Sequence, residues 1–153
     1  MVIVQKVRGF EVVSAFQDNK NVVLPKRKTT QSAGYDFASC EGIVLWPMKI
    51  TLVPTGIKSY MLSNEVLQLY IRSSLSLKGV VLVNGSGIID ADYYNNQNNE
   101  GHIMFPLMNI SDAPIAISPG DRIGQGIFHG YFITDDDVAD GIRVGGLGST
   151  GVS

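Results

Sequence analysis

Short apolar runs, bounded by turn-forming residues, recur along the whole chain. The runs are rich in β-branched and aromatic residues, which favour strands, and glycine, proline, asparagine or aspartate separates them. No window of helix length keeps the apolar spacing of an amphipathic helix. The pattern predicts strand-like segments at residues 2–4, 22–24, 43–46, 50–53, 66–71, 80–83, 102–110, 113–117 and 127–133. We therefore expect an all-β domain, a sandwich or a jelly roll, with at most one short helix.

Two segments depart from this pattern. Residues 95–99 form a polar tract of asparagine and glutamine without an apolar anchor. Residues 145–153 consist of glycine, serine and threonine apart from two apolar residues. Because neither segment can bury much apolar surface, we expect both to be mobile without a ligand. The sequence thus predicts a β domain over residues 1–142 and a flexible glycine-rich C-terminal arm over residues 143–153.

The composition restricts what the protein can bind. The 153 residues suit one domain, and 12 Lys and Arg against 14 Asp and Glu give a formal net charge of −2. Without a positive field across the surface, we expect no binding of nucleic acid or of an anionic membrane. Cys40 is the only cysteine, and no apolar run approaches the length of a membrane span. We therefore expect a cytoplasmic protein.

The tail contains a G-x-G-x-x-G pattern at residues 146–151. A dinucleotide-binding fingerprint needs a strand before these glycines and a helix after them, and the sequence predicts neither. The glycines and the hydroxyls of Ser149 and Thr150 could still surround a phosphate, with a solvated tail as the simpler alternative. The chain lacks the P-loop and nucleophile-elbow motifs, which excludes P-loop NTPases and α/β-hydrolases.

Two further clusters carry chemistry. Asp90 and Asp92 follow an Asn-Gly-Ser-Gly turn, and an extended chain would put both carboxylates on one face unless a turn intervenes. They could share a metal, or one could act as a general base; a solvated turn is the common alternative. Arg72, Ser73 and Ser74 follow a predicted strand. A guanidinium beside two hydroxyls suits a phosphate, although an arginine at a surface turn would look the same.

Taken in order, these clusters resemble the motifs of the trimeric dUTP pyrophosphatase (dUTPase) family. Five segments carry the resemblance: Ala33–Phe37, Arg72–Gly79, Gly87–Tyr93, Gly120–Gln125, and Arg143 with Gly145–Gly151. The resemblance implies a jelly-roll-like (β-clip) fold and a homotrimer with active sites between subunits. It also implies hydrolysis of dUTP to dUMP and pyrophosphate, which keeps uracil out of DNA and supplies dUMP. The arm is expected to close over a site on neighbouring subunits.

The resemblance also assigns roles to residues. Asp90 would accept a proton from the water that attacks the α-phosphorus, and Mg²⁺ would be held mainly by the phosphates and by water, with Asp36 contacting it through a bound water. The remaining substrate contacts would come from Arg72, Ser73, Ser74 and Gln125 at the α- and β-phosphates, Arg143, Ser149 and Thr150 at the γ-phosphate, Asn84, Gly87 and Ile89 at the uracil, Tyr93 at the deoxyribose, and Gly146 and Leu147 in the arm.

Two features differ from the usual family pattern. Leu147 occupies the position where the fifth motif usually has an aromatic residue. Residues 94–99 form an extra loop before Glu100 and Gly101, similar to loops in dUTPases of Gram-positive bacteria and their phages. Two alternatives stay open: a dCTP deaminase of the same fold, and a phage-type regulatory dUTPase that binds a repressor-type protein partner through this loop.

Overall fold

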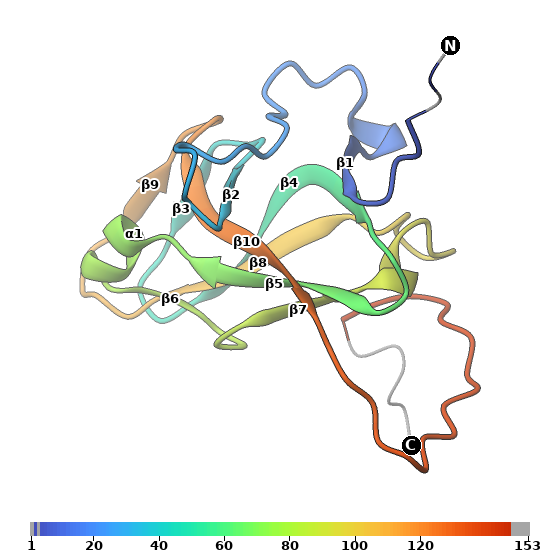
Figure 1. Ribbon diagram of the computed structural model, residues 1–153. Coiled ribbons are helices and arrows are strands. Elements are labelled where there is room, and N and C mark those ends of the chain that lie inside the picture. Colours follow the sequence, from blue (N-terminus) through green and yellow to red (C-terminus); the bar gives the residue numbers. More distant parts are fainter. Residues whose placement is uncertain (1, 3, 148–153) are drawn as a thin grey trace.

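Two four-stranded antiparallel sheets lie against each other in the computed structural model, which describes residue 2 and residues 4–147 (Figure 1). The first sheet has the order β1 (Gly9–Val12), β4 (Ile50–Tyr60), β8 (Ile103–Asn109) and β6 (Val80–Leu82). The second has the order β2 (Tyr35–Ala38), β10 (Arg122–Gly130), β5 (Glu65–Ile71) and β7 (Gly87–Asp90). Strands β3 (Ile43–Leu45) and β9 (Ile115–Ile117) pair separately. The mostly β fold predicted from the sequence is confirmed.

Helical structure is short, as the sequence predicts. The α-helix α1 spans Ser73–Leu77, and two 3₁₀ turns span Ser14–Phe16 (η1) and Ala91–Tyr93 (η2). Within residues 4–147, no helix is long and apolar enough to cross a membrane.

Buried and partly exposed residues alternate along the strands, and the buried ones form the core between the two sheets. In β8, Ile103, Phe105 and Leu107 are fully buried, while the residues between them are only partly covered. The ring of Phe105 meets that of Phe37 from β2 at a centroid distance of 5.6 Å, which joins the two sheets. Burying each such side chain stabilises the fold by roughly 1.5–3 kcal/mol.

Strand β4 is longer than the sequence suggests. Pro54, Thr55 and Gly56 look like a break, but the strand continues through them with a register shift against β8. The Thr55 hydroxyl donates to the carbonyl of Ile103 at 2.6 Å, which replaces a missing ladder bond. Gly56 has a φ of +73°, and a Cβ there would lie 2.6 Å from Val22. A bulge that only glycine can occupy therefore keeps the strand in the sheet.

The loop after η2 has an anchor that the apolar pattern could not reveal. Asn96 is only 8% exposed; its Nδ2 donates to the Tyr93 carbonyl at 2.7 Å and its Oδ1 accepts from the backbone of Asn98. Lys58 donates to Glu100 at 2.7 Å, and this bond is the main cause that lowers the pKa of Glu100 to about 2. Residues 95–99 have no apolar anchor, as the sequence indicates, but polar hydrogen bonds tie the loop to the body of the protein.

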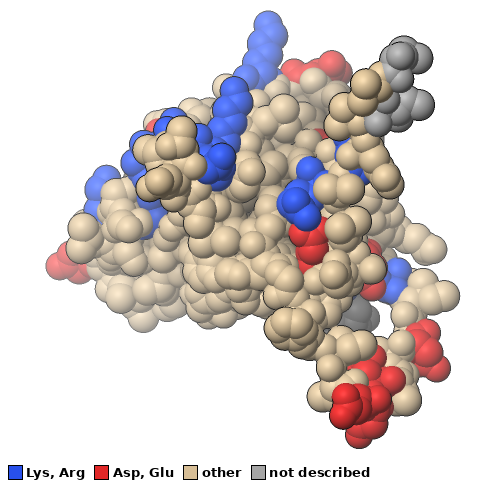
Figure 2. All heavy atoms as spheres, viewed as in Figure 1, with Lys and Arg blue, Asp and Glu red and all other residues tan. Residues whose placement is uncertain are grey.

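The segment after β10 leaves the body of the protein (Figure 1). Residues 131–142 are exposed along their length and include Asp135, Asp136, Asp137 and Asp140. Figure 2 shows acidic side chains gathered on this projecting segment. The predicted strand at 127–133 therefore ends early, at Gly130. Residues 22–24 were also expected to form a strand and have irregular structure.

His102 connects the bulge in β4 to the end of the loop that follows η2. Its Nε2 accepts a hydrogen bond from the backbone N–H of Gly56 at 2.9 Å, and its ring lies 4.7 Å from that of Phe16. Burial lowers the pKa of His102 because the charged form loses hydration. A proton on Nε2 would also remove the acceptor for the Gly56 N–H.

The lowered pKa of His102 predicts a loss of stability in mild acid. The folded protein favours the neutral ring, so its stabilisation is complete above the unfolded pKa near 6.5 and is lost as the pH falls from there toward the folded pKa. Urea unfolding should show the free energy of unfolding decreasing below about pH 6.5 by up to about 1.4 kcal/mol per pH unit. His102→Gln should flatten this slope, whereas exposed His129→Gln should not. An unchanged slope in His102→Gln would contradict the prediction.

Candidate active site

Strand β5 carries a candidate half-site at each end. It pairs with β7 on one edge and with β10 on the other. Near its start, Val66 lies opposite Asp90, and at its end Ile71 lies opposite Gly124 and leads directly into Arg72. The segments that the sequence singled out are thus fixed by one strand.

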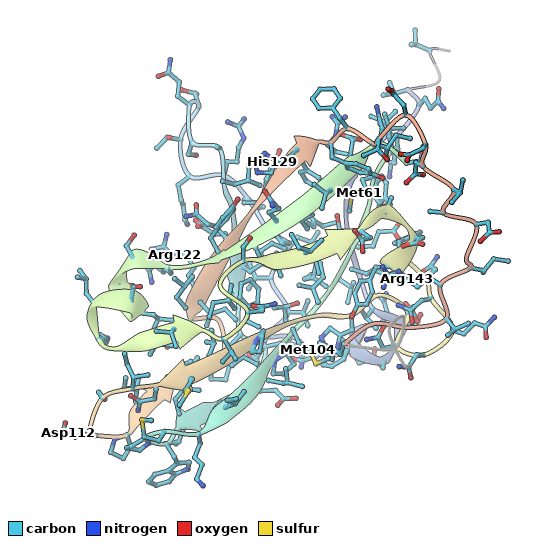
Figure 3. The ribbon with its side chains drawn as sticks, turned by 90° about the horizontal axis from the view of Figure 1, so that it is seen from below. Met61, Met104, Asp112, Arg122, His129 and Arg143 are labelled. Carbon is cyan, nitrogen blue, oxygen red and sulfur yellow. The ribbon has the colours of Figure 1, made fainter. Side chains whose placement is uncertain are left out.

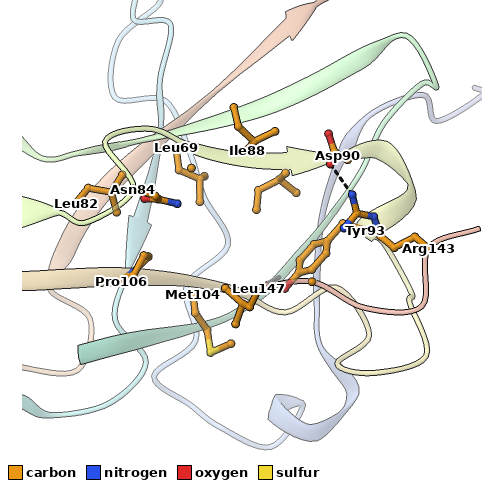
Figure 4. A pocket seen from close by; sticks show the side chains of 13 residues that line it. Leu69, Leu82, Asn84, Ile88, Asp90, Tyr93, Met104, Pro106, Arg143 and Leu147 are labelled. Carbon is orange, nitrogen blue, oxygen red and sulfur yellow. Dashed lines mark hydrogen bonds and ion pairs between the residues drawn. The ribbon is translucent and has the colours of Figure 1, made fainter. Parts of the chain in front are cut away.

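The first half-site is a narrow apolar slot of about 90 Å³ beside the turn that connects β6 to β7 (Figure 4). In this turn the Gly85 N–H donates to the Leu82 carbonyl at 2.9 Å, with Val83 and Asn84 between them. Gly87 is closely packed, since a Cβ there would lie 3.0 Å from Leu69. The slot is lined by Leu69, Leu82, Asn84, Gly87, Ile88, Ile89, Asp90, Tyr93, Met104, Pro106, Arg143, Gly146 and Leu147.

Asp90 ends β7, and the 3₁₀ turn η2 begins immediately after it. This turn intervenes between Asp90 and Asp92, so they do not share a strand face. Both carboxylates instead contact Arg143: Nη2 lies 2.6 Å from Asp90 Oδ2, and Nε lies 2.6 Å from Asp92 Oδ1. The two carboxylates therefore hold a guanidinium.

Tyr93 forms one wall of the slot. The side chain is buried, its hydroxyl donates to the His102 carbonyl at 2.6 Å and accepts from Asn99 Nδ2 at 2.8 Å, and burial is the main cause that raises its pKa. A Cβ on Gly146 would lie 2.3 Å from the Tyr93 ring, so the backbone of the arm passes directly over that ring. The tyrosine is fixed in place before any ligand binds.

The second half-site is a polar hollow of about 310 Å³ at the other end of β5. Asp36, Arg72, Ser73, Ser74, Gly124 and Gln125 line it. Gln125 pairs with Asp36 across β10 and β2, and a Cβ on Gly34 would lie 2.1 Å from its Oε1, so the glutamine side chain lies against Gly34. Asp36 also meets Arg122 at 3.4 Å. The hollow thus offers a guanidinium, hydroxyls and an amide, which suit phosphate oxygens.

Metal ligands are sparse in both half-sites. Within residues 4–147, no group of three or more histidine, cysteine, aspartate or glutamate side chains could hold a metal ion. Asp36 is the carboxylate of the polar hollow. A single carboxylate fits Mg²⁺ that takes its other ligands from phosphates and water.

The structure divides the candidate residues between the two half-sites. The slot contains Asn84, Gly87, Ile89, Asp90, Tyr93, Arg143, Gly146 and Leu147, and the polar hollow contains Asp36, Arg72, Ser73, Ser74 and Gln125. Ser149 and Thr150 lie outside the described residues. The arm is expected to close over a site on neighbouring subunits. In this single chain, residues 143–147 instead contact Asp90 and Tyr93 of the same chain.

Sequence reasoning missed several residues of the slot. Met104 and Pro106 line it from β8, on the opposite face to buried Phe105. Their alternation with Phe105 was a usable signal, because it put them on the outer face of the strand. The contact of Asp92 with Arg143 had no local signal, since 51 residues separate the two.

The two half-sites of one chain are far apart. Arg72 lies six residues beyond Val66, the partner of Asp90, which corresponds to about 20 Å along an extended strand. Of the residues that the structure describes, none lines both half-sites. Figure 3 shows Arg122, which contacts Asp36 of the polar hollow, well apart from Arg143 at the slot. The backbone positions that carry Asp90 and Arg72 of one chain thus lie at opposite ends of β5.

Comparison with known proteins identifies the family. The dUTPase family model matches residues 20–150. A deoxyuridine 5'-triphosphate nucleotidohydrolase of Lactococcus lactis is 46% identical over 149 residues, which cover 95% of this chain and 99% of that protein. The crystal structure of dUTPase from Streptococcus mutans is 45% identical, with a TM-score of 0.78 over 83% of this chain and 98% of that one.

A more distant structure shares the fold. The dUTPase of phage phi11 of S. aureus, described with a structural Mg(II) ion, has a TM-score of 0.70 over 89% of this chain and 98% of that one at 21% identity. At this identity the likeness concerns the fold alone. The family model covers most of the chain, and the Lactococcus relative matches it almost from end to end. The chain therefore belongs to the dUTPase family.

Proposed function

We propose that this protein hydrolyses dUTP to dUMP and pyrophosphate. Membership of the dUTPase family and 46% identity to a deoxyuridine 5'-triphosphate nucleotidohydrolase support this activity. The observation that carries the proposal is the pair of half-sites: a narrow apolar slot with a carboxylate at its edge, and a polar hollow with a guanidinium, hydroxyls and an amide. A nucleotide has a flat base that suits an apolar slot and charged phosphates that suit a polar hollow.

The slot suits the nucleoside. Its small volume and apolar walls match a flat pyrimidine, and the backbone of Gly87 and Ile89 with the Asn84 side chain supplies polar groups at its edge. Tyr93 lies against the sugar, where its fixed ring leaves no room for a 2′-hydroxyl. Leu147 covers the slot with an aliphatic side chain, where most members of the family have an aromatic one.

Asp90 is the general base. Its carboxylate is about half exposed at the edge of the slot, so a water molecule can reach it. Asp90 takes a proton from this water as the water attacks the α-phosphorus in line, and pyrophosphate leaves. Arg72, Ser73, Ser74 and Gln125 hold the α- and β-phosphates, and Arg143, Ser149 and Thr150 bind the γ-phosphate.

Mg²⁺ is the cofactor we propose. When bound, it offsets the negative charge of the triphosphate and of the leaving pyrophosphate. Asp36 in the polar hollow would hold it through a bound water, and the phosphates would provide most of its ligands.

We infer that the active sites form between the subunits of a homotrimer. The separation of about 20 Å between Asp90 and Arg72 along β5 supports sites built from two copies. An apolar surface supports association: Trp46, Met48, Ile50 and Leu52 are 45–63% exposed. Ile50 and Leu52 lie opposite Met108 and Pro106 of β8, which extends this apolar surface across the sheet. Contiguous apolar surface of this kind marks protein interfaces.

The two alternative functions gain no support. Membership of the dUTPase family argues against a dCTP deaminase. The phage enzymes are only 20–22% identical to this chain, so their similarity supports a shared fold and does not support a shared regulatory partner. A repressor-type partner is therefore not part of the proposal.

Asp90→Asn should abolish turnover while leaving the fold intact. Loss of a general base typically lowers kcat by about 10²- to 10⁴-fold, and Asn keeps the shape of the side chain. The measurement is the initial rate of pyrophosphate release from dUTP, with exposed Asp112→Asn as the control. Turnover of Asp90→Asn within about tenfold of wild type would assign the base to another residue. Equal wild-type rates with dUTP, dCTP and dTTP would contradict the function itself.

Tyr93→Ala should weaken the preference for dUTP over UTP. The ring acts by occupying space, so its removal should reduce the ratio of the two kcat/KM values by about tenfold or more, a typical value for one group in a fitted pocket. Tyr93→Phe keeps the ring and should keep the ratio, although it loses the bonds to His102 and Asn99. If Tyr93→Ala and wild type show the same ratio, the discrimination lies elsewhere.

A further inference from the structure

Asp92 makes a contact that the roles above leave unexplained. Its Oδ1 accepts from Arg143 Nε at 2.6 Å, and the carboxylate is otherwise 62% exposed. Asp92 lies in η2, which follows directly on Asp90, so the two carboxylates have a fixed relation to each other. Arg143 is the better buried partner, with 15% of its side chain exposed.

The guanidinium of Arg143 has three separate partners. Nε donates to Asp92, Nη2 donates to Asp90 at 2.6 Å, and Nη1 donates to the carbonyl of Gly145 at 3.0 Å. A guanidinium carries five N–H donors, so two remain for an incoming anion. A lysine could not serve three acceptors in this planar arrangement.

These contacts also determine where the arm enters the slot. The bond from Nη1 to Gly145 folds the chain back on the arginine. Gly146 then passes over the Tyr93 ring. Leu147 reaches the slot, as Figure 4 shows. The position of one guanidinium therefore fixes the course of residues 145–147.

Asp90 cannot hold Arg143 alone throughout catalysis as proposed. When Asp90 accepts the proton from water, its carboxylate loses the charge that attracts Nη2. If Asp90 alone held Arg143, protonation of the base would also release the arm, and the side chain would regain the rotamer freedom of an unbound arginine. A second carboxylate on Nε removes this conflict, because Asp92 keeps its charge and the guanidinium stays in place.

We propose that Asp92 is the positioning residue for Arg143. It holds Nε beside the slot, so that the N–H groups left on Nη1 and Nη2 can bind a phosphate oxygen of dUTP while Asp90 accepts the proton. The contact can form within one chain, as here, or between an arm and a neighbouring subunit. This inference rests on the proposed roles of Asp90 and Arg143.

Tryptic cleavage after Arg143 tests the contact without substrate. An arginine held by Asp92 resists the protease, so Asp92→Asn should release residues 144–153 about two- to fivefold faster than wild type, the range for an exposed ion pair. Asp92→Glu keeps the carboxylate and should fall between the two. Asp112→Asn is the matched control, because Figure 3 shows Asp112 at the far end of the molecule from Arg143. Equal cleavage rates in Asp92→Asn and wild type would overturn the proposal.

A double-mutant cycle tests the role in turnover. Asp92→Asn should lower kcat/KM for dUTP about two- to fivefold when Arg143 is present and should have no further effect in Arg143→Ala. An equal loss in both backgrounds would mean that Asp92 acts through something other than Arg143, which overturns the proposal. The two proposals fail on different results. Turnover that survives in Asp90→Asn would contradict the role of Asp90, whereas the protease result does not depend on turnover.

Discussion

Strand β5 is hydrogen-bonded along both edges, and this double pairing determines where the chemistry can take place. On one edge it holds β7, which ends at Asp90, and on the other it holds β10, which carries Gln125. Because the strand is extended, its two ends are about 20 Å apart, and neither half-site can move toward the other without breaking the sheet. The same pairing that stabilises the fold therefore keeps the two half-sites of one chain apart, which supports the proposal that each active site uses two copies.

Close packing gives the slot its shape. Gly87 and Gly146 are sites where a Cβ would crowd Leu69 and Tyr93, so the backbone itself forms much of the wall. Tyr93 is held from behind by the His102 carbonyl and by Asn99, and Asn99 belongs to the extra loop after η2. That loop thus helps to support the slot. The proposed exclusion of a 2′-hydroxyl depends on this rigidity, because a mobile ring would move aside.

The features that the sequence predicts and those that it misses differ in how far apart along the chain the interacting residues lie. Local patterns revealed β5, β8 and the turn before Gly87, since alternation and turn residues lie close together in the chain. The continuation of β4 through Pro54 was missed because Thr55 and His102 repair the ladder from a distance. The anchor at Asn96 and the contact between Asp92 and Arg143 were missed for a related reason: polar side chains carry them, and hydrophobic periodicity does not register such bonds. The assignment of half-sites came from motif resemblance, and the distance between them came only from the strand register.

The most direct test of sites shared between copies is complementation of two inactive chains. Asp90→Asn and Arg72→Ala chains, each nearly inactive alone, are co-expressed at equal levels, and the assembly is checked for a mass of three 16.6 kDa chains. With sites between adjacent copies and random assembly, about one quarter of the sites pair an intact Asp90 with an intact Arg72. As a control, wild type co-expressed with the double variant should also give about one quarter, whereas sites within one chain would give about one half. The account predicts activity near one quarter of wild type in the first mixture, and a mixture as inactive as its two parents would contradict it.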